Sequence, residues 1–324
     1  MAKQFIERRK DGKTFDYFLN GEKVTDRELK VYFKSLRIPP AWRQVKISYN
    51  QKARILATGI DSAGRVQYIY HPAFRARKEK EKFERILRFA QALPRMRRVT
   101  AEHLSHRQLD KEKVIACIVR LMDKAYFRVG NEEYAQQNQS YGLTTIRSKH
   151  TTVHGDTIVF DFVGKSGQKH LKEITNKKLA RIIKKLDDLP GYEVFKYYGE
   201  DGELKNIDSE DVNTYIKDVM GEEFSAKDFR TWGGTVLATA ELATAGRPSG
   251  RRERKKALTA CIKNVAKKLG NTPAITRGSY IDPRVINAYV NSDLLSRLRS
   301  KVERVKRKSY LSADEHCLLK LLEQ

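Results

Sequence analysis

The beginning of the chain carries the short hydrophobic runs and turn residues that are typical of β-structure. Asn20-Gly21 provides two residues that tolerate positive φ angles, which predicts a β-hairpin with a type I′ turn. Thr25 and Glu28 have the spacing of a capping box and predict a helix that runs to about Leu36. The chain is therefore expected to begin with strands and one short helix.

Two further strands are predicted at residues 55–60 and 65–70, which are rich in β-branched and aromatic residues. The residues between them, 61–64, end in a glycine and favour a turn. Together with the first hairpin, these elements predict a small sheet-bearing domain. It is expected to end near His71-Pro72, and we assign residues 1–76 to it.

Beyond residue 76 the hydrophobic positions recur mainly at helical spacing. Amphipathic helices are predicted at residues 111–127, 179–186 and 212–219, and a further helix follows Ser225. One β-rich run, at 157–163, is followed by a glycine-bounded turn and a more polar strand, which predicts a hairpin with Lys165 at its tip. The expected fold class is therefore α+β, with a mainly helical second domain over residues 77–324.

The charge of the chain indicates a polyanionic partner. The 324 residues include 65 Lys and Arg against 40 Asp and Glu, a formal net charge of +25. A charge of that size costs self-repulsion in the folded state, and a basic surface gains affinity for nucleic acid by releasing condensed counterions. Double-stranded DNA is the favoured partner, and a merely well-solvated surface is the alternative.

Composition excludes several other classes of protein. The chain is 32% charged, and we find no apolar run of membrane-spanning length and no apolar signal-peptide centre, so a cytoplasmic protein is expected, nucleoid-associated if it is bacterial. Its three cysteines form no close pair, which argues against a disulfide framework or a zinc site. No Walker loop and no metal-ligand spacing is present, and we expect no cofactor and no metal.

Three segments carry candidate chemistry. Arg230 lies beside Phe229 and Trp232 on a helix otherwise rich in Ala and Thr, and a buried arginine must be paired or bind an anion. Lys165, at the hairpin tip, is either an ordinary exposed lysine or a group delivered to a phosphate. The sequence Gly270-Asn-Thr-Pro predicts a helix stop followed by a new short helix that leads to Tyr280.

Five separated motifs occur in a recognisable order. The motifs of the second domain are Phe-Arg128-Val-Gly, Phe-Val-Gly-Lys165, Asp-Phe-Arg230-Thr-Trp-Gly and Gly-Asn271-Thr-Pro…Tyr280. Their order and spacing resemble the type IB DNA topoisomerases of the small poxvirus-like and bacterial kind. The resemblance covers essentially the whole chain. The set of residue types alone, which is Arg, Lys, Arg, His or Asn, and Tyr, is shared with tyrosine recombinases. It implies a catalytic domain of the topoisomerase IB and tyrosine recombinase type.

The resemblance implies a role for each matched residue. Tyr280 corresponds to the attacking tyrosine, Arg128 and Arg230 to the phosphate-clamping arginines, and Lys165 to the general acid. The fifth position is Asn271, where many relatives have histidine. Asparagine can donate a hydrogen bond to a phosphate oxygen but carries no titratable proton.

The resemblance also extends to the N-terminal domain. There Asp61-Ser-Ala-Gly-Arg65…Gln67-Tyr68-Ile-Tyr70 is similar to the strand with which the family grips duplex DNA. The residues alone leave two readings open, a ribbon in a major groove or an ordinary half-buried strand. The implied DNA-binding residues are Arg65, Gln67, Tyr68, Tyr70 and, in the second domain, Tyr134.

The implied function is relaxation of supercoiled DNA by a monomeric clamp that needs neither ATP nor metal. A tyrosine would attack one strand, form a 3′-phosphotyrosyl link, and reverse the reaction after the free end has rotated. Two alternatives stay open: a tyrosine site-specific recombinase, and a non-catalytic DNA-binding protein of the same fold.

Overall fold

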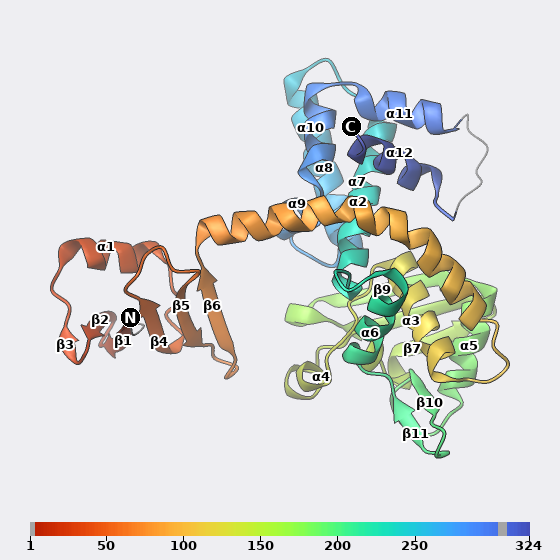
Figure 1. The fold of residues 1–324 in the computed structure, drawn as a ribbon, viewed down its shortest axis with the longest axis horizontal. Coiled ribbons are helices and arrows are strands. Elements are labelled where there is room, and N and C mark those ends of the chain that lie inside the picture. Colours follow the sequence, from red (N-terminus) through yellow and green to blue (C-terminus); the bar gives the residue numbers. More distant parts are fainter. Residues whose placement is uncertain (1–3, 304–309) are drawn as a thin grey trace. The chain divides into compact units, whose positions relative to one another are not determined.

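The computed structural model describes residues 4–303 and 310–324. The chain divides into two compact units, Met1–Lys82 and Phe83–Gln324. A long helix, α2 (Pro72–His103), contains the boundary, and the boundary predicted between residues 76 and 77 also falls within this helix. The expected α+β class is confirmed, with a sheet in the first unit and mainly helices in the second (Figure 1).

The first unit is built on one antiparallel sheet with the strand order β3-β2-β1-β4-β5-β6. Its strands are β1 (Phe5–Asp11), β2 (Thr14–Leu19), β3 (Glu22–Lys23), β4 (Arg43–Ser48), β5 (Ile55–Ile60) and β6 (Val66–Tyr70). Helix α1 (Arg27–Ser35) contributes Phe33 to a core that includes Ile6 and Ile47. Strand β6 is an edge of this sheet, which leaves one side of the strand open for another partner.

The predicted turn is confirmed and the predicted helix cap is wrong by one residue. Asn20 has φ 51° and Gly21 has φ 88°, as a type I′ turn requires. The N-cap of α1 is Asp26, not Thr25, and its carboxylate accepts from the backbone N–H groups of Glu28 at 2.7 Å and Leu29 at 3.1 Å. An aspartate accepts both bonds and also places a negative charge at the positive end of the helix.

The second unit combines helices with a small antiparallel sheet. Its helices after α2 are α3 (Lys111–Ala125), α4 (Glu132–Asn138), α5 (Lys177–Asp187), α6 (Ser209–Met220), α7 (Ala226–Ala245), α8 (Arg251–Leu269), α9 (Pro273–Ser279), α10 (Pro283–Asn291), α11 (Leu294–Glu303) and α12 (Ala313–Leu322). The sheet is formed by β7 (Thr151–His154), β8 (Thr157–Val163) and β9 (Lys169–Thr175), and β10 (Lys196–Tyr198) pairs with β11 (Leu204–Asn206). None of the helices in the described residues is long and apolar enough to cross a membrane.

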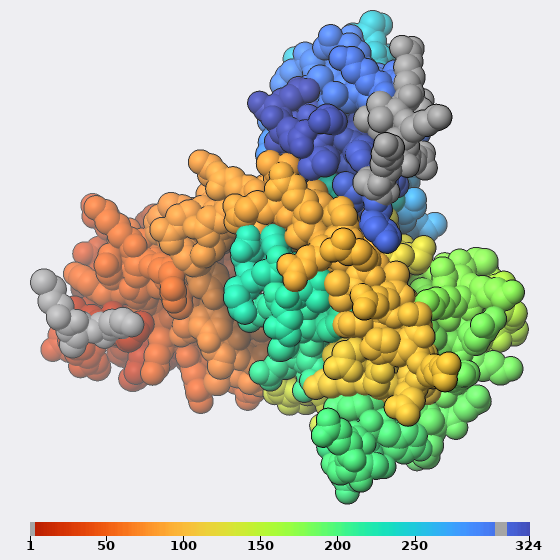
Figure 2. Space-filling model, turned by 45° about the vertical axis from the view of Figure 1, so that its right-hand side comes forward, coloured from red at the N-terminus to blue at the C-terminus, as the bar shows by residue number. Residues whose placement is uncertain are grey.

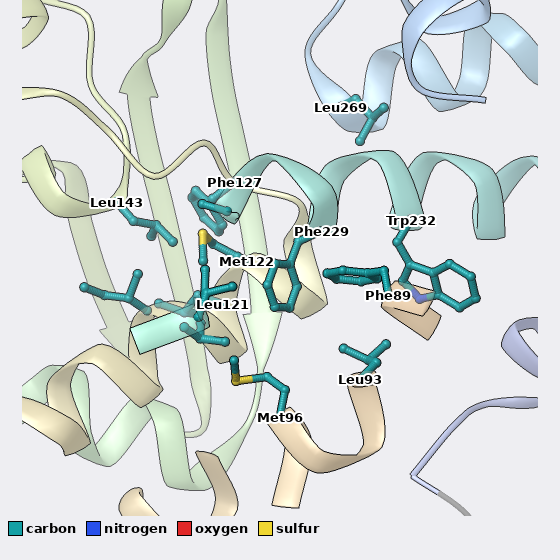
Figure 3. Close-up of a cluster of buried hydrophobic side chains, with 14 of the residues drawn as sticks. Phe89, Leu93, Met96, Leu121, Met122, Phe127, Leu143, Phe229, Trp232 and Leu269 are labelled. Carbon is teal, nitrogen blue, oxygen red and sulfur yellow. The ribbon is translucent and has the colours of Figure 1, made fainter. Parts of the chain in front are cut away.

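Helix α7 is the centre of the second unit. It packs against α3, α6, α8, α10, α11 and α12, and Figure 1 shows the last four gathered about its C-terminal part. Figure 3 shows Phe229 and Trp232 of α7 meeting Phe89 of α2, where the rings of Phe89 and Phe229 are 5.0 Å apart in an edge-to-face arrangement. The first turns of α7 are therefore almost fully buried. A polar side chain there is surrounded by other protein groups and not by solvent.

Polar contacts outside the hydrophobic core also fix the position of the beginning of α7. Its N-cap is Ser225, as predicted, and the capping box is completed by Asp228. Arg85 of α2 bonds Asp228 at 2.9 Å, and Arg88 bonds Glu223 at 2.9 Å. Figure 2 shows these two segments side by side at the surface of the unit. The N-terminal turn of α7 is thereby tied to α2.

A buried ion-pair network joins the last helix to the core. Arg97 bonds Asp123 and Glu315, each at 2.7 Å, and all three side chains are almost fully buried. Glu315 also accepts from the indole N–H of Trp232 at 3.1 Å, which connects α12 to α7. Arg120 adds a longer contact to Asp123 at 3.3 Å, so Arg97 is the main partner of both carboxylates.

Replacing that guanidinium is expected to destabilise the second unit. Arg97→Met would leave two buried carboxylates without their main partner, and removal of one member of a buried pair costs about 3–5 kcal/mol. We expect the free energy of unfolding in urea at pH 7 to fall by that amount. Lys205→Met, which breaks the exposed Lys205–Asp201 pair at 2.6 Å, is the control and should cost under about 1 kcal/mol. Equal effects of the two substitutions would contradict this assignment.

Candidate active site

Five residues that the sequence singles out line one cavity in the second unit. Its volume is about 500 Å³, and its walls include Arg128, Lys165, Arg230, Asn271 and Tyr280. They arrive from different segments: the loop after α3, the β8–β9 hairpin, α7, the α8–α9 connection and the end of α9. The fold therefore brings together groups that lie as far as 152 positions apart in the sequence, from Arg128 to Tyr280.

Tyr280 is held by its backbone. It is the C-cap of α9, and its N–H donates to the carbonyl of Thr276 at 3.0 Å, while its own carbonyl accepts from the Thr235 hydroxyl at 3.2 Å. Gly234 is needed at this contact, because a Cβ there would lie 2.7 Å from the Tyr280 carbonyl oxygen. Helix α7 and the end of α9 can therefore approach closely, and the phenol is directed into the cavity.

Positive charge surrounds the phenol of Tyr280. Burial by itself raises the pKa of this phenol, but the charge and hydrogen bond of Arg230 and the charges of Arg128 and Lys227 lower it by more. The net result is a pKa below the usual tyrosine value. The Arg230 guanidinium carbon is 5.2 Å from the centre of the Tyr280 ring. A tyrosine in this environment forms its phenolate more readily than one in water.

Arg230 is a buried cation whose neighbours are backbone carbonyls, the phenol of Tyr280 and other cations. Its side chain donates to the carbonyl of Tyr126 and to that of Leu269, the latter at 2.9 Å, while its Nε is buried with no hydrogen-bond partner in the described part of the chain. Burial and the nearby charge of Arg128 lower its pKa to about 10. The sequence predicted that a buried arginine here is either paired or binds an anion, and the unpartnered Nε is a donor with which an anion can pair.

Arg128 and Asn271 are bonded to each other. The guanidinium of Arg128 donates to Oδ1 of Asn271 at 2.6 Å and to the carbonyl of Gly270 at 3.2 Å. Because an arginine only donates, the carboxamide must turn its oxygen toward Arg128 and its Nδ2 away. That Nδ2 is a buried donor without a partner among residues 4–303 and 310–324. Asn271, which lines the cavity, therefore keeps one buried hydrogen-bond donor unpaired.

Lys165 occupies the hairpin tip, as predicted. It begins a short 3-10 turn between β8 and β9, where Ser166 has φ 62° and Gly167 has φ 72°. Its side chain is exposed and lines the same cavity as the two arginines. An exposed ammonium on a short turn can approach a phosphate that enters the cavity.

Three cationic or basic neighbours were not predicted from the sequence. Lys227 lies one helical turn before Arg230 and lines the cavity, a relation that the spacing of three residues could have indicated. His170 and Lys172 are two residues apart on β9 and therefore point to the same face of the sheet. The His170 ring fills the space at Gly270, where a Cβ would lie 2.0 Å from it, and burial followed by nearby cations lowers its pKa to about 4.

The predicted DNA-binding residues of the first unit fall on two faces of β6. Arg65 and Gln67 meet at Asp61, whose carboxylate accepts from Arg65 Nε at 2.8 Å and from Gln67 Nε2 at 3.0 Å. Tyr68 and Tyr70 lie on the opposite face, exposed, with stacked rings 5.9 Å apart. Their contact with DNA stays a prediction.

Tyr134 lies in the second unit beside the catalytic candidates. It lines a cavity of about 240 Å³ together with Arg128 and Lys165, and its backbone N–H is bonded to Asn131 at 3.0 Å as part of the cap of α4. The structure thus groups Tyr134 with the site of Arg128, and its role toward DNA also stays a prediction.

The fold and this site define a known class of enzyme. Residues 71–308 match the family described as the catalytic core of eukaryotic DNA topoisomerase I, and residues 14–61 match the N-terminal domain of bacterial DNA topoisomerase IB. The chain therefore belongs to the type IB DNA topoisomerases, which are isomerases.

Individual relatives agree with that assignment. The chain is 35% identical over 296 residues to DNA topoisomerase 1B of Acanthamoeba polyphaga mimivirus, covering 89% of this chain and 88% of the relative. It is 25% identical over 297 residues to DNA topoisomerase 1B of vaccinia virus strain Copenhagen, covering 88% and 90%. A match to DNA topoisomerase 1 of Drosophila melanogaster, 25% identical, covers 63% of this chain and 21% of that protein. The resemblance inferred from the motifs is confirmed.

Proposed function

We propose that this chain relaxes supercoiled duplex DNA by cleaving one strand transiently and resealing it through a 3′-phosphotyrosyl intermediate at Tyr280, without ATP or metal. The observation that carries the proposal is the pair of buried, unpartnered donors, Arg230 Nε and Asn271 Nδ2, in a cavity that also contains a phenol of lowered pKa. Buried donors left unpaired cost free energy, and a phosphate that accepts from them would remove that cost.

The proposed chemistry assigns one task to each group. Tyr280 first releases its phenolic proton to water; the phenolate oxygen then attacks the phosphorus, and the bond from phosphorus to the 5′ oxygen breaks. Arg128 and Arg230 with Asn271 stabilise the charge that develops on the nonbridging oxygens. Lys165 gives its proton to the departing 5′ oxygen, which becomes a hydroxyl. Resealing is the reverse reaction, and the phosphotyrosyl bond conserves the energy of the broken phosphodiester.

We further propose that the enzyme acts as a monomer whose two units enclose the duplex. The net charge of +25 supports a binding mode dominated by phosphate contacts, whose affinity falls steeply as salt rises. Base contacts from β6 would add sequence information to that attraction.

The test is relaxation of a negatively supercoiled plasmid in EDTA without ATP. The proposal expects full relaxation under these conditions. If no relaxation occurs but a covalent adduct is still trapped, the result favours a recombinase. Native mass measurement of the DNA complex would then identify the tetramer that a recombinase needs. Absence of both relaxation and adduct would leave a DNA-binding protein.

The position of Gln67 is expected to depend on Asp61. Bonds from Arg65 and from backbone N–H groups lower the pKa of this carboxyl to about 2, so it is charged throughout the physiological range. Asp61→Asn removes that charge and sets an amide N–H against the donors of Arg65 and Gln67. We expect DNA affinity to fall several-fold, because Arg65 and Gln67 are no longer held in place before DNA binds. The rate at which strands already cleaved are resealed should not change.

The control for this prediction is Asp16→Asn in the same unit. It breaks the pair of Asp16 with Lys23 at 2.6 Å on strands away from β6 and should leave DNA affinity unchanged. Gln67→Ala should reproduce the effect of Asp61→Asn. A defect confined to the chemical step in either Asp61→Asn or Gln67→Ala would show that β6 has been assigned the wrong role.

A further inference from the structure

Lys172 is a partly buried cation that the proposed mechanism does not use. It points inward from β9, and its ammonium donates to the carbonyl of Ala125 at 2.7 Å and to that of Lys268 at 3.1 Å. Ala125 is the last residue of α3, and Lys268 lies in the last turn of α8. One ammonium therefore joins the negative ends of two helices, where a cation is stabilising.

Arg230 repeats this arrangement one residue farther along both segments. It donates to the carbonyls of Tyr126 and Leu269, which directly follow the two carbonyls that Lys172 holds. Arg128 continues the series by donating to the carbonyl of Gly270. The ends of α3 and α8 are thus cross-linked by successive cations, and the segments so joined are the ones that carry Arg128 and Asn271.

The space behind these cations is nearly filled. A void of only about 10 Å³ remains between side chains that include Arg128, His170, Lys172 and Arg230. That is at the lower limit of the space that holds one water molecule. Water on this inner side therefore has little room to replace the ammonium of Lys172, and the part-buried carbonyl of Ala125 depends on the lysine.

We propose that Lys172 is a positioning residue for phosphodiester transfer: by bridging the ends of α3 and α8 it sets the spacing of Arg128, Arg230 and Asn271 around the phosphate. The proposal rests on the phosphotyrosyl function proposed above. Lys172 acts through the two arginines and the asparagine and does not touch the reacting atoms. Loss of the bridge leaves only Arg230 and Arg128 to join the two helix ends, so these ends can shift, and a small displacement of groups that hold the transition state is costly.

The charge of Lys172 gives the proposal a measurable signature. Burial, then Arg230 and Arg128, lowers the pKa of this lysine to about 8. The groups that face it are Arg230 from α7, Arg128 from the loop after α3, and on its own strand His170, which is neutral above about pH 4. Because the folded pKa is lowered, the ammonium is present at pH 7 and is lost as pH rises through about 8. Cleavage by the free enzyme should then decline.

The first experiment measures the rate of covalent adduct formation in a single turnover with Lys172→Met. Methionine has a similar length and volume but donates no hydrogen bond, so we expect adduct formation to slow about 10- to 100-fold. DNA affinity, measured in a Tyr280→Phe background, should stay near that of the wild type. The matched control is Lys169→Met, an exposed lysine on the same strand, which should leave the rate unchanged.

The second experiment measures the pH dependence of cleavage at subsaturating DNA, where the profile reports the free enzyme. A substrate with sulfur at the bridging 5′ position removes the need for the Lys165 proton. Wild type should lose rate above about pH 8, and Lys172→Met should lack this decline. This profile tests the proposal on the wild type even if Lys172→Met does not fold.

Three results would overturn the proposal: an unchanged rate in folded Lys172→Met, an equal slowing in Lys169→Met, or a wild-type profile without the decline. Failure of the proposed function has a different signature, since the wild type itself would then form no Tyr280-dependent adduct at any pH.

Discussion

Tyr280→Phe is expected to form no covalent adduct with DNA. The substitution removes only the phenol oxygen, which is the proposed nucleophile, and leaves the position of the ring against α7 unchanged. Adduct formation should fall to background, because no second phenol lines the cavity in the described part of the chain. Trapping on radiolabelled DNA in denaturing gels measures this directly. DNA affinity should be nearly unchanged, since the phosphate contacts of Arg128, Arg230 and Asn271 are intact.

The matched control for this prediction is Tyr289→Phe. Tyr289 is buried on α10, and its hydroxyl has no hydrogen-bond partner among the described residues, so its removal leaves no group newly unpaired. Adduct yield and affinity should both equal the wild type. A residual adduct in Tyr280→Phe, or a large loss of affinity with nicking retained, would mean that Tyr280 supports DNA binding and that another residue attacks.

Local chemistry made part of this site predictable. Thr272 accepts from the N–H of Ile275 and Pro273 occupies the first turn of α9, so the short helix that ends at Tyr280 follows from adjacent residues. Arg230 was marked by its apolar neighbours alone, because a charge on such a helix needs a partner. In each case the deciding interaction lies within a few residues, where a sequence pattern can record it.

Other features depend on partners that are distant in the sequence. Lys172 bonds carbonyls 47 and 96 positions away, and no pattern on β9 identifies a backbone carbonyl as its partner. Strands β1 and β4 were missed for a related reason: they pair with each other across an intervening hairpin and helix, and β4 is interrupted by a bulge where Gln44 has φ 49°. The cap of α1 was misassigned between two adjacent residues that can both cap, and only geometry decides between them.

Lys165→Ala is expected to slow cleavage of an ordinary phosphodiester by about 10²- to 10⁴-fold, the usual contribution of a general acid. The 5′ oxygen is a poor leaving group unless it receives a proton as its bond to phosphorus breaks. A substrate with sulfur at that bridging position releases a thiolate, which needs little protonation because thiols are much stronger acids than alcohols. The same substitution should therefore slow cleavage of the sulfur substrate far less.

The ratio of the two slowing factors isolates the proton transfer from every other role of the hairpin. If Lys165 acted only by attracting the phosphate, its loss would slow both substrates equally, because their charges are the same. Lys169→Ala, on the same hairpin and also exposed, should slow neither. Arg230→Gln should slow both alike, because a phosphate-binding residue stabilises the transition state whichever atom departs. Equal slowing in Lys165→Ala would remove the general-acid assignment while leaving Tyr280 as the nucleophile.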